Sequence, residues 1–225
     1  MTEFDASIGL DSVPTSPRLA VQDMTTTPAG DVPGRAGTLA DLERLHAADC
    51  THCCRATSHR NLVFGEGNED ASLMFVGEAP GAEEDRQGRP FVGRAGELLD
   101  RMISALELHR QDVYIANILK SRPPDNRTPT PKETANCGPW LERQIDLVRP
   151  KVIVTLGAVP TKYLLGITDG ITRARGKWGT YEGNGGDIPV MPTFHPAYVL
   201  RQYTPEVRGA VWNDLQDAKS RAYSA

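Results

Sequence analysis

Leu73-Met74-Phe75-Val76-Gly77-Glu78-Ala79-Pro80-Gly81-Ala82-Glu83-Glu84-Asp85 decides the fold of this chain. Its four leading apolar residues predict a buried strand, and a turn rich in glycine, proline and carboxylates follows directly. Further apolar runs alternate with helical patterns along the chain. The apolar runs are 113–119, 152–156 and 189–193, and the helical patterns are 95–108, 132–148, 160–165 and 205–222. This alternation predicts a three-layer α/β/α sandwich around a central, mostly parallel four-stranded sheet.

The first 37 residues differ in composition from the rest. They are rich in proline, threonine, serine, glycine and aspartate, which predicts a disordered acidic tail over 1–37 and one folded domain over 38–225. Thr38 is a good N-cap for a helix that ends near Cys50. The chain has neither a signal-like start nor an apolar run of about 20 residues, so we expect a cytoplasmic protein that contacts no membrane.

The net charge of -4 comes from the first 45 residues, and the remainder is neutral. Within that remainder, the segments 120–132 and 171–178 are basic. Such segments suit phosphate groups, although solvated loops have the same composition.

The cysteines suggest a metal or redox centre. The spacing Cys50-x-x-Cys53, in a chain without a secretory signal, favours metal or redox ligands over a structural disulfide. Cys137, on a predicted helix, could complete the site from another element. Zinc, an iron-sulfur cluster and simple buried thiols all stay open on spacing alone.

Three other side chains follow predicted strands or turns at the same sheet edge, where α/β folds bind ligands. Phe91 lies in a loop, so its ring can stack on a flat ligand such as a base, with core packing as the alternative. The amide of Asn117 matches the edge of a nucleobase, with a structural hydrogen bond as the alternative. His195 follows the strand 189–193, a typical catalytic position.

These motifs together resemble the uracil-DNA glycosylase superfamily, and specifically its family 4, the iron-sulfur branch. The resemblance covers about two thirds of the chain. The matching motifs are, in order, Gly77-Glu78-Ala79-Pro80-Gly81, Gly88-Arg89-Pro90-Phe91-Val92-Gly93, Asn117, Arg122-Pro123-Pro124-Asp125-Asn126-Arg127, Arg175-Gly176-Lys177-Trp178 and His195-Pro196-Ala197-Tyr198.

The resemblance implies an enzyme that flips uracil out of single- or double-stranded DNA and hydrolyses its N-glycosidic bond, initiating base excision repair. By the family pattern Phe91 stacks on uracil, Asn117 reads its polar edge, and His195 donates to the oxygen that gains negative charge. The backbone amides from Ala79 to Gly81 are expected to bind uracil too. We expect the enzyme to act as a monomer.

The carboxylates divide by the same pattern. Classical uracil glycosylases have a water-activating aspartate where this chain has Ala79. Glu84 resembles the residue that closes the pocket against thymine, and Glu78 and Asp85 are candidates for positioning water or stabilising the sugar cation. The basic residues expected to contact DNA are Lys120, Arg122, Arg127, Arg175, Lys177 and Arg201.

Family 4 holds a four-iron, four-sulfur cluster with four cysteines. Cys50, Cys53 and Cys137 match three of them, and Ser121 occupies the fourth position. Ser121 could ligate through oxygen, another residue such as Cys54 or His52 could substitute, or the cluster could have an open site or be missing. We expect a cluster with these three cysteines and a non-cysteine fourth ligand.

Two other functions compete with the enzyme. One is a non-catalytic iron-sulfur module that binds DNA as part of a repair or replication complex; the combination of Phe91, Asn117 and His195 argues against it. The other is a zinc-stabilised α/β hydrolase acting on free nucleotides, which the basic loops disfavour.

Overall fold

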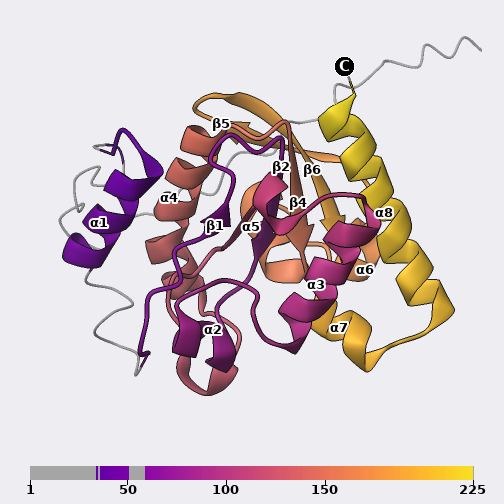
Figure 1. The fold of residues 1–225 in the computed structure, drawn as a ribbon, viewed down its shortest axis with the longest axis horizontal. Helices are drawn as coiled ribbons and strands as arrows, with labels where there is room; N and C mark the ends of the chain where they lie inside the picture. The colour runs from indigo at the N-terminus through magenta and orange to yellow at the C-terminus, as the bar shows by residue number, and fades with distance from the viewer. Residues whose placement is uncertain (1–33, 35, 51–58, 225) are drawn as a thin grey trace, which may run out of the picture. The chain divides into compact units, whose positions relative to one another are not determined.

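The computed structural model describes residues 34, 36–50 and 59–224. A six-stranded sheet in the order β1-β3-β2-β4-β6-β5 forms its centre (Figure 1). Four parallel strands are β2 (Leu73–Gly77), β3 (Tyr114–Asn117), β4 (Val152–Leu156) and β6 (Gly186–Thr193). Two antiparallel strands, β1 (Glu66–Gly67) and β5 (Gly179–Gly183), add the two edges. The four predicted strands are confirmed, and the predicted strand count of four is wrong because both edges carry an additional strand.

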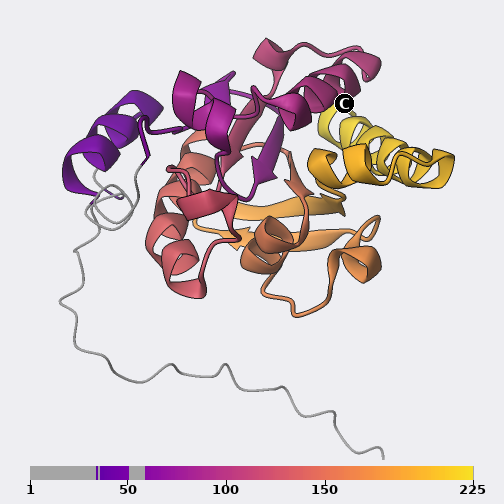
Figure 2. The same ribbon diagram turned by 90° about the horizontal axis from the view of Figure 1, so that it is seen from below.

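Helices cover both faces of this sheet, as Figures 1 and 2 show. The helices are α1 (Leu39–Asp49), α2 (Ala82–Gln87), α3 (Arg94–Ala105), α4 (Pro131–Val148), α5 (Ala158–Leu165), α6 (Ile171–Ala174), α7 (Pro196–Arg201) and α8 (Pro205–Tyr223). Two short 3-10 turns, Arg110–Asp112 and Pro124–Asn126, lie in loops. The long predicted helices are confirmed within a few residues at each end.

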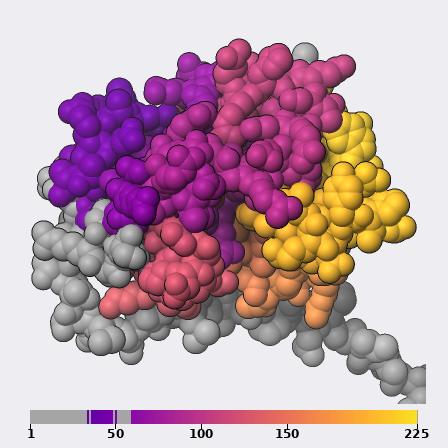
Figure 3. Space-filling view, turned by 60° about the horizontal axis from the view of Figure 1, so that its bottom comes forward, coloured from indigo at the N-terminus to yellow at the C-terminus, as the bar shows by residue number. Residues whose placement is uncertain are grey.

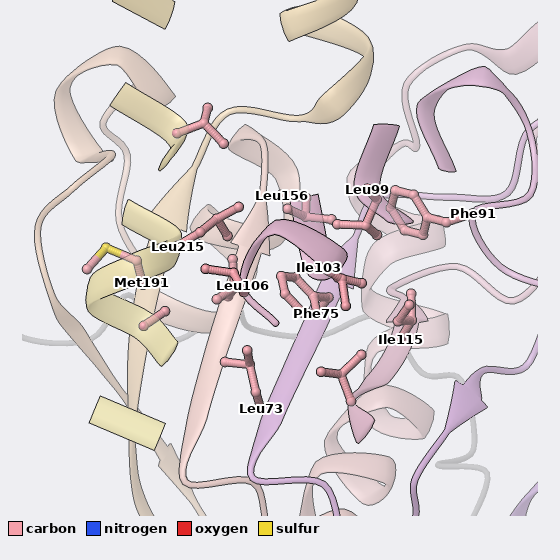
Figure 4. Close-up of a cluster of buried hydrophobic side chains, with 14 of the residues drawn as sticks. Leu73, Phe75, Phe91, Leu99, Ile103, Leu106, Ile115, Leu156, Met191 and Leu215 are labelled. Carbon is pink, nitrogen blue, oxygen red and sulfur yellow. The ribbon is translucent and has the colours of Figure 1, made fainter. Parts of the chain in front are cut away.

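The side chains of β2 show how the layers are held. Leu73 and Phe75 belong to the hydrophobic cluster that α3, α7 and α8 cover, whereas Met74 and Val76 belong to the cluster that α4 and α5 cover. Because successive side chains of a strand point to opposite faces of the sheet, β2 contributes to two hydrophobic cores, one on each face. Figure 4 shows the first core, with Phe91 at its edge. Each fully buried side chain of this size stabilises the fold by about 2 kcal/mol.

Local signals set the helix starts. Thr38 caps α1 by accepting a hydrogen bond from the Asp41 amide at 3.1 Å, as predicted. At α4, Thr130 and Glu133 form a reciprocal capping box, and Pro131 occupies the first turn, where its missing N–H has no helical partner to lose.

The predicted tail falls largely outside the described residues, but its end packs on the domain. Ala36 is buried, and its carbonyl accepts a hydrogen bond from Arg143 Nη2 at 2.5 Å. No helix in the described part of the chain has the length and apolar character that crossing a membrane requires.

Candidate active site

A pocket of about 490 Å³ opens at the carboxyl ends of β2, β3 and β6, the edge where the sequence predicts a ligand site. Figure 3 shows a face on which the segments that line it meet. The lining residues are Glu78, Ala79, Pro80, Gly81, Glu84, Phe91, Ala95, Asn117, Pro123, Asn126, Arg127, His195, Ala197 and Arg201. The carboxylate turn, Phe91, Asn117 and His195 are thus brought together.

The wall of the pocket depends on Gly77, the last residue of β2. A Cβ placed there would lie 2.3 Å from Asn117 Oδ1 and 2.5 Å from the Phe91 ring. Contacts that short are repulsive, so only glycine lets both side chains close over the end of the strand. The ring of Phe91 also stacks on His195, with centroids 5.7 Å apart and planes 30° apart.

Asn117 presents an acceptor into this pocket. The residue is only 2% exposed, and its Oδ1 has no hydrogen-bond partner among the described residues. A buried carbonyl without a partner is costly, at about 1–3 kcal/mol. The amide therefore suits a ligand that supplies an N–H, since such a ligand recovers the missing hydrogen bond.

His195 presents a donor. Its Nδ1 accepts a hydrogen bond from the Ala197 amide at 3.1 Å, so Nδ1 carries no proton. The pKa of His195 is lowered to about 4, chiefly by burial and also by the charge of Arg201, against an opposing effect of the Glu84 carboxylate. The ring is therefore neutral near pH 7 with its proton on Nε2, which makes Nε2 a donor for a ligand.

The three candidate carboxylates have different environments. The Glu84 carboxylate accepts hydrogen bonds from three backbone amides, those of Val92 at 2.9 Å, Gly93 at 2.8 Å and Gly81 at 3.1 Å. The carboxylate of Glu78 accepts no hydrogen bond within the described part of the chain, and its burial raises its pKa. Glu78 is therefore the pocket carboxylate whose oxygens are available.

Asp85 does not line the pocket. It is 3% exposed and accepts hydrogen bonds from the amides of Arg60 at 2.7 Å and Asn61 at 3.2 Å. It anchors the segment that precedes β1 to α2, which is a structural role.

The turn itself offers fewer amides than the sequence implies. Pro80 has no N–H, and the Gly81 amide is already bonded to Glu84. This leaves the amide of Ala79 as the donor of the turn.

Two of the predicted DNA contacts are bonded to groups of the protein itself. Lys120 is fully buried, with Nζ 2.7 Å from Asn117 O and 2.5 Å from Gln144 Oε1. Arg175 donates from Nε to Asp214 at 3.0 Å and from Nη2 to Ala210 O at 2.8 Å, and its side chain is partly exposed. Lys120 cannot reach a phosphate group in this conformation, so its prediction is corrected to a structural role, whereas a DNA contact of Arg175 stays a prediction that competes with its pairing to Asp214.

The other four basic residues stay accessible. Arg127 and Arg201 line the pocket, and Lys177 is exposed beside Trp178. Arg127 pairs with Glu133 at 2.7 Å, and Arg122 Nε donates to Asn126 at 2.7 Å.

Sequence reasoning missed several lining residues. Pro123 and Asn126 enter through the 3-10 turn, and Ala95 enters at the start of α3. Asn126 has a φ of 53°, a left-handed conformation that asparagine tolerates well. The sequence shows the motif that contains Pro123 and Asn126, but it does not show which residues of the motif face the pocket.

Three of the residues predicted as cluster ligands are described, and all three are buried: Cys50, Cys137 and Ser121. Ser121 Oγ has no partner within the described residues, although it is a strong hydrogen-bonding group. Cys53, Cys54 and His52 lie outside the described residues. Among the residues that are described, no three histidine, cysteine or acidic side chains are grouped to hold a metal ion.

Comparison with known proteins identifies the family. The model of the Uracil DNA glycosylase superfamily matches residues 64–216. The chain is 48% identical to a Type-4 uracil-DNA glycosylase of Thermotoga maritima, over 81% of this chain and 94% of the relative. It is 44% identical to the Archaeoglobus fulgidus Type-4 uracil-DNA glycosylase, over 80% and 90%. A Type-5 uracil-DNA glycosylase of Pyrobaculum aerophilum is more distant, at 32% over 70% and 87%. With its sheet, its pocket and these relatives taken together, the chain belongs to the uracil-DNA glycosylase superfamily, in its type-4 branch.

Proposed function

We propose that this chain is a uracil-DNA glycosylase, which hydrolyses the bond between uracil and deoxyribose in DNA and so initiates base excision repair. The observation that carries the proposal is the buried Asn117 Oδ1, which has no partner among the described residues and which lies with the Phe91 ring at the end of β2. Uracil has an imide N–H flanked by two carbonyl oxygens. That edge supplies the donor which Asn117 lacks and acceptors for its amide NH₂ and for His195 Nε2.

His195 and the turn stabilise the departing base. As the glycosidic bond breaks, negative charge gathers on a uracil oxygen, where the Nε2 proton of His195 is available. A donor already in place is worth about 3–4 kcal/mol because it needs no reorganisation. The amide of Ala79 supports the same charge from the other side of the pocket.

Glu78 is the proposed partner of the sugar or of the attacking water. It lines the pocket, and its carboxylate accepts no hydrogen bond from the described residues, whereas the Glu84 carboxylate accepts from three amides. A carboxylate in that place lowers the energy of a positively charged sugar as the base leaves, and it can orient a water molecule. Glu84 keeps the loop closed over the base, which supports its role in excluding thymine.

The substrate is proposed to be DNA in which the uridine nucleotide is flipped into the pocket. Four accessible basic residues support this, namely Arg122, Arg127, Lys177 and Arg201. We propose that the enzyme acts as a monomer, through a domain that begins near Thr38.

The assay uses single- and double-stranded oligonucleotides that contain one uracil, followed by alkaline cleavage at abasic sites. We expect the wild-type enzyme to give cleaved strands, and we expect His195→Ala to lower the single-turnover rate by about 10²–10³-fold. The matched control is His109→Ala, since His109 is exposed on another loop and should leave the rate unchanged. DNA binding without product at any enzyme concentration would favour the non-catalytic module instead.

We also propose a four-iron, four-sulfur cluster, held by Cys50, Cys53 and Cys137 with Ser121 as the fourth ligand. The buried Ser121 oxygen, which has no partner within the described residues, supports the fit. A cluster in this place would tie α4 and the segment after β3 together, so its chemistry is structural.

Iron and sulfide analysis of anaerobically purified protein tests this proposal. We expect about four of each per chain. Ser121→Cys should keep that content and change the reduction potential of the cluster, and wild-type protein without iron would contradict the proposal.

A further inference from the structure

Phe91 has an unusual backbone conformation. Its φ of 50° lies in the left-handed region, which bulky residues rarely adopt. Backbone strain of this kind persists only where the surroundings hold it, and it is frequent at ligand sites. The same residue carries the ring that stacks on His195, so the strained backbone sets the position of that ring.

Charged side chains hold the peptide groups on both sides of Phe91. The Glu84 carboxylate accepts hydrogen bonds from the amides of the two residues after Phe91, Val92 at 2.9 Å and Gly93 at 2.8 Å. Arg110 binds the carbonyl groups of Phe91 and of the residue before it: Nη1 donates to Phe91 O at 3.1 Å, and Nη2 donates to Pro90 O. An anion therefore binds two N–H groups and a cation binds two carbonyl groups of one short loop.

Arg110 is itself fixed by two carboxylates. Its Nε lies 2.8 Å from Glu66 Oε1 on β1, and its Nη1 lies 2.7 Å from Asp100 Oδ1 on α3. Its side chain is only 18% exposed. A guanidinium with a planar, forked set of donors can satisfy four acceptors at once, which an ammonium cannot do.

The carbonyl of Phe91 is also confined by helix α3. A Cβ at Gly96 would lie 1.9 Å from Phe91 O, so the first turn of α3 lies directly against this carbonyl. The position of the oxygen that Arg110 binds is thus fixed by backbone as well as by charge.

We infer that Arg110 is a positioning residue for base stacking, which acts on uracil only through Phe91. The inference rests on the proposed function, because it assumes that uracil stacks on this ring. Without the guanidinium, the carbonyls of Pro90 and Phe91 lose their donor, and the strained residue relaxes and moves its ring. A misplacement of about 1 Å in such a site lowers rates substantially.

A double-mutant cycle tests the inference with Arg110→Gln, Phe91→Ala and the double variant, using single-turnover excision from a single-stranded uracil oligonucleotide. We expect Arg110→Gln to be slower than wild type by about 10-fold. The double variant should be no slower than Phe91→Ala, since a residue that acts through the ring has no effect once the ring is gone. Losses that multiply in the double variant would overturn the inference.

Arg89→Gln is the matched control. Arg89 pairs with the same Glu66, at 2.6 and 2.8 Å, but in the described structure it donates to neither loop carbonyl. Its removal should change the rate by less than about 2-fold, because exposed ion pairs contribute little. An Arg89→Gln loss equal to that of Arg110→Gln would mean that Glu66 pairing, and not the loop carbonyls, is responsible.

Hydrogen exchange separates positioning from folding. Arg110→Gln should accelerate exchange in residues 90–93 and leave β2 and β4 protected, and Arg110→Lys should fall between wild type and Arg110→Gln. Faster exchange throughout the sheet would show a structural role and contradict the inference. An inactive wild-type enzyme contradicts the proposed function, whereas an active wild type matched by Arg110→Gln contradicts this inference only.

Discussion

His195 makes the stability of the protein depend on pH. Its folded pKa of about 4 lies below the usual value of 6.5 because of burial. The unfolded chain therefore binds a proton between these values that the folded protein does not bind, so stability is full above about pH 6.5 and falls as the pH falls toward 4. We expect urea unfolding of wild type to lose about 1–2 kcal/mol more than His195→Gln between pH 7 and pH 5. Parallel curves for the two proteins would contradict this.

Gly77 controls how closely Asn117 and Phe91 approach. Gly77→Ala adds a methyl group 2.3 Å from the Asn117 oxygen, and both pocket side chains must move. We expect uracil excision to fall by about 10²-fold while the circular dichroism of the fold persists. Gly170→Ala is the control, because no atom lies within 4 Å of its added Cβ. Equal rates in both variants would show that the pocket tolerates the displacement.

At the scale of elements, α8 is anchored by a partly buried ion pair between Asp214 and Arg175. Asp214 is 2% exposed and accepts from Thr193 on β6 at 2.7 Å and from Arg175 at 3.0 Å. Asp214→Ala leaves the Arg175 guanidinium without its carboxylate, and we expect unfolding in urea to show a loss of about 3–5 kcal/mol. The variant Arg175→Met with Asp214→Leu should recover part of that loss, and a double variant as unstable as the single one would contradict the anchoring role.

The elements that the sequence predicts are those with a repeating pattern. β2 and β4 are continuous apolar runs, and α4 and α8 have caps and periodic apolar residues, so their positions were predictable. The edge strand Gly179–Gly183 has two glycines and an exposed face, and Glu66–Gly67 is too short for any pattern. Both form because a neighbouring strand offers hydrogen bonds, which is information from the tertiary structure.

At the scale of the whole molecule, the candidate site was predictable as a set of motifs, and the internal contacts of two of its basic residues were not. The resemblance to the family placed Phe91, Asn117 and His195 in one pocket correctly. Lys120, which follows β3, is fully buried, and Arg175, which follows α6, is partly buried and pairs with Asp214. A charged residue type in a sequence does not show whether the side chain is exposed. Arg110 could not be predicted as part of the site because it contacts the Phe91 loop only in the folded chain.

The internal contacts of these two cations change the expected strength of DNA binding. Residues after the first 45 are neutral overall, so affinity depends on local cations and not on net charge. With Lys120 buried and Arg175 paired with Asp214, four of the six predicted phosphate contacts remain, and each releases about 0.9 counterion from duplex DNA. The logarithm of the binding constant should therefore fall with the logarithm of salt concentration with a slope of about -3 to -4. Fluorescence anisotropy with His195→Ala and a uracil duplex measures that slope, and Lys177→Gln should reduce its magnitude by about 1. A slope steeper than about -5 would mean that Lys120 and Arg175 also reach the phosphates, which requires both to leave their internal partners when DNA binds.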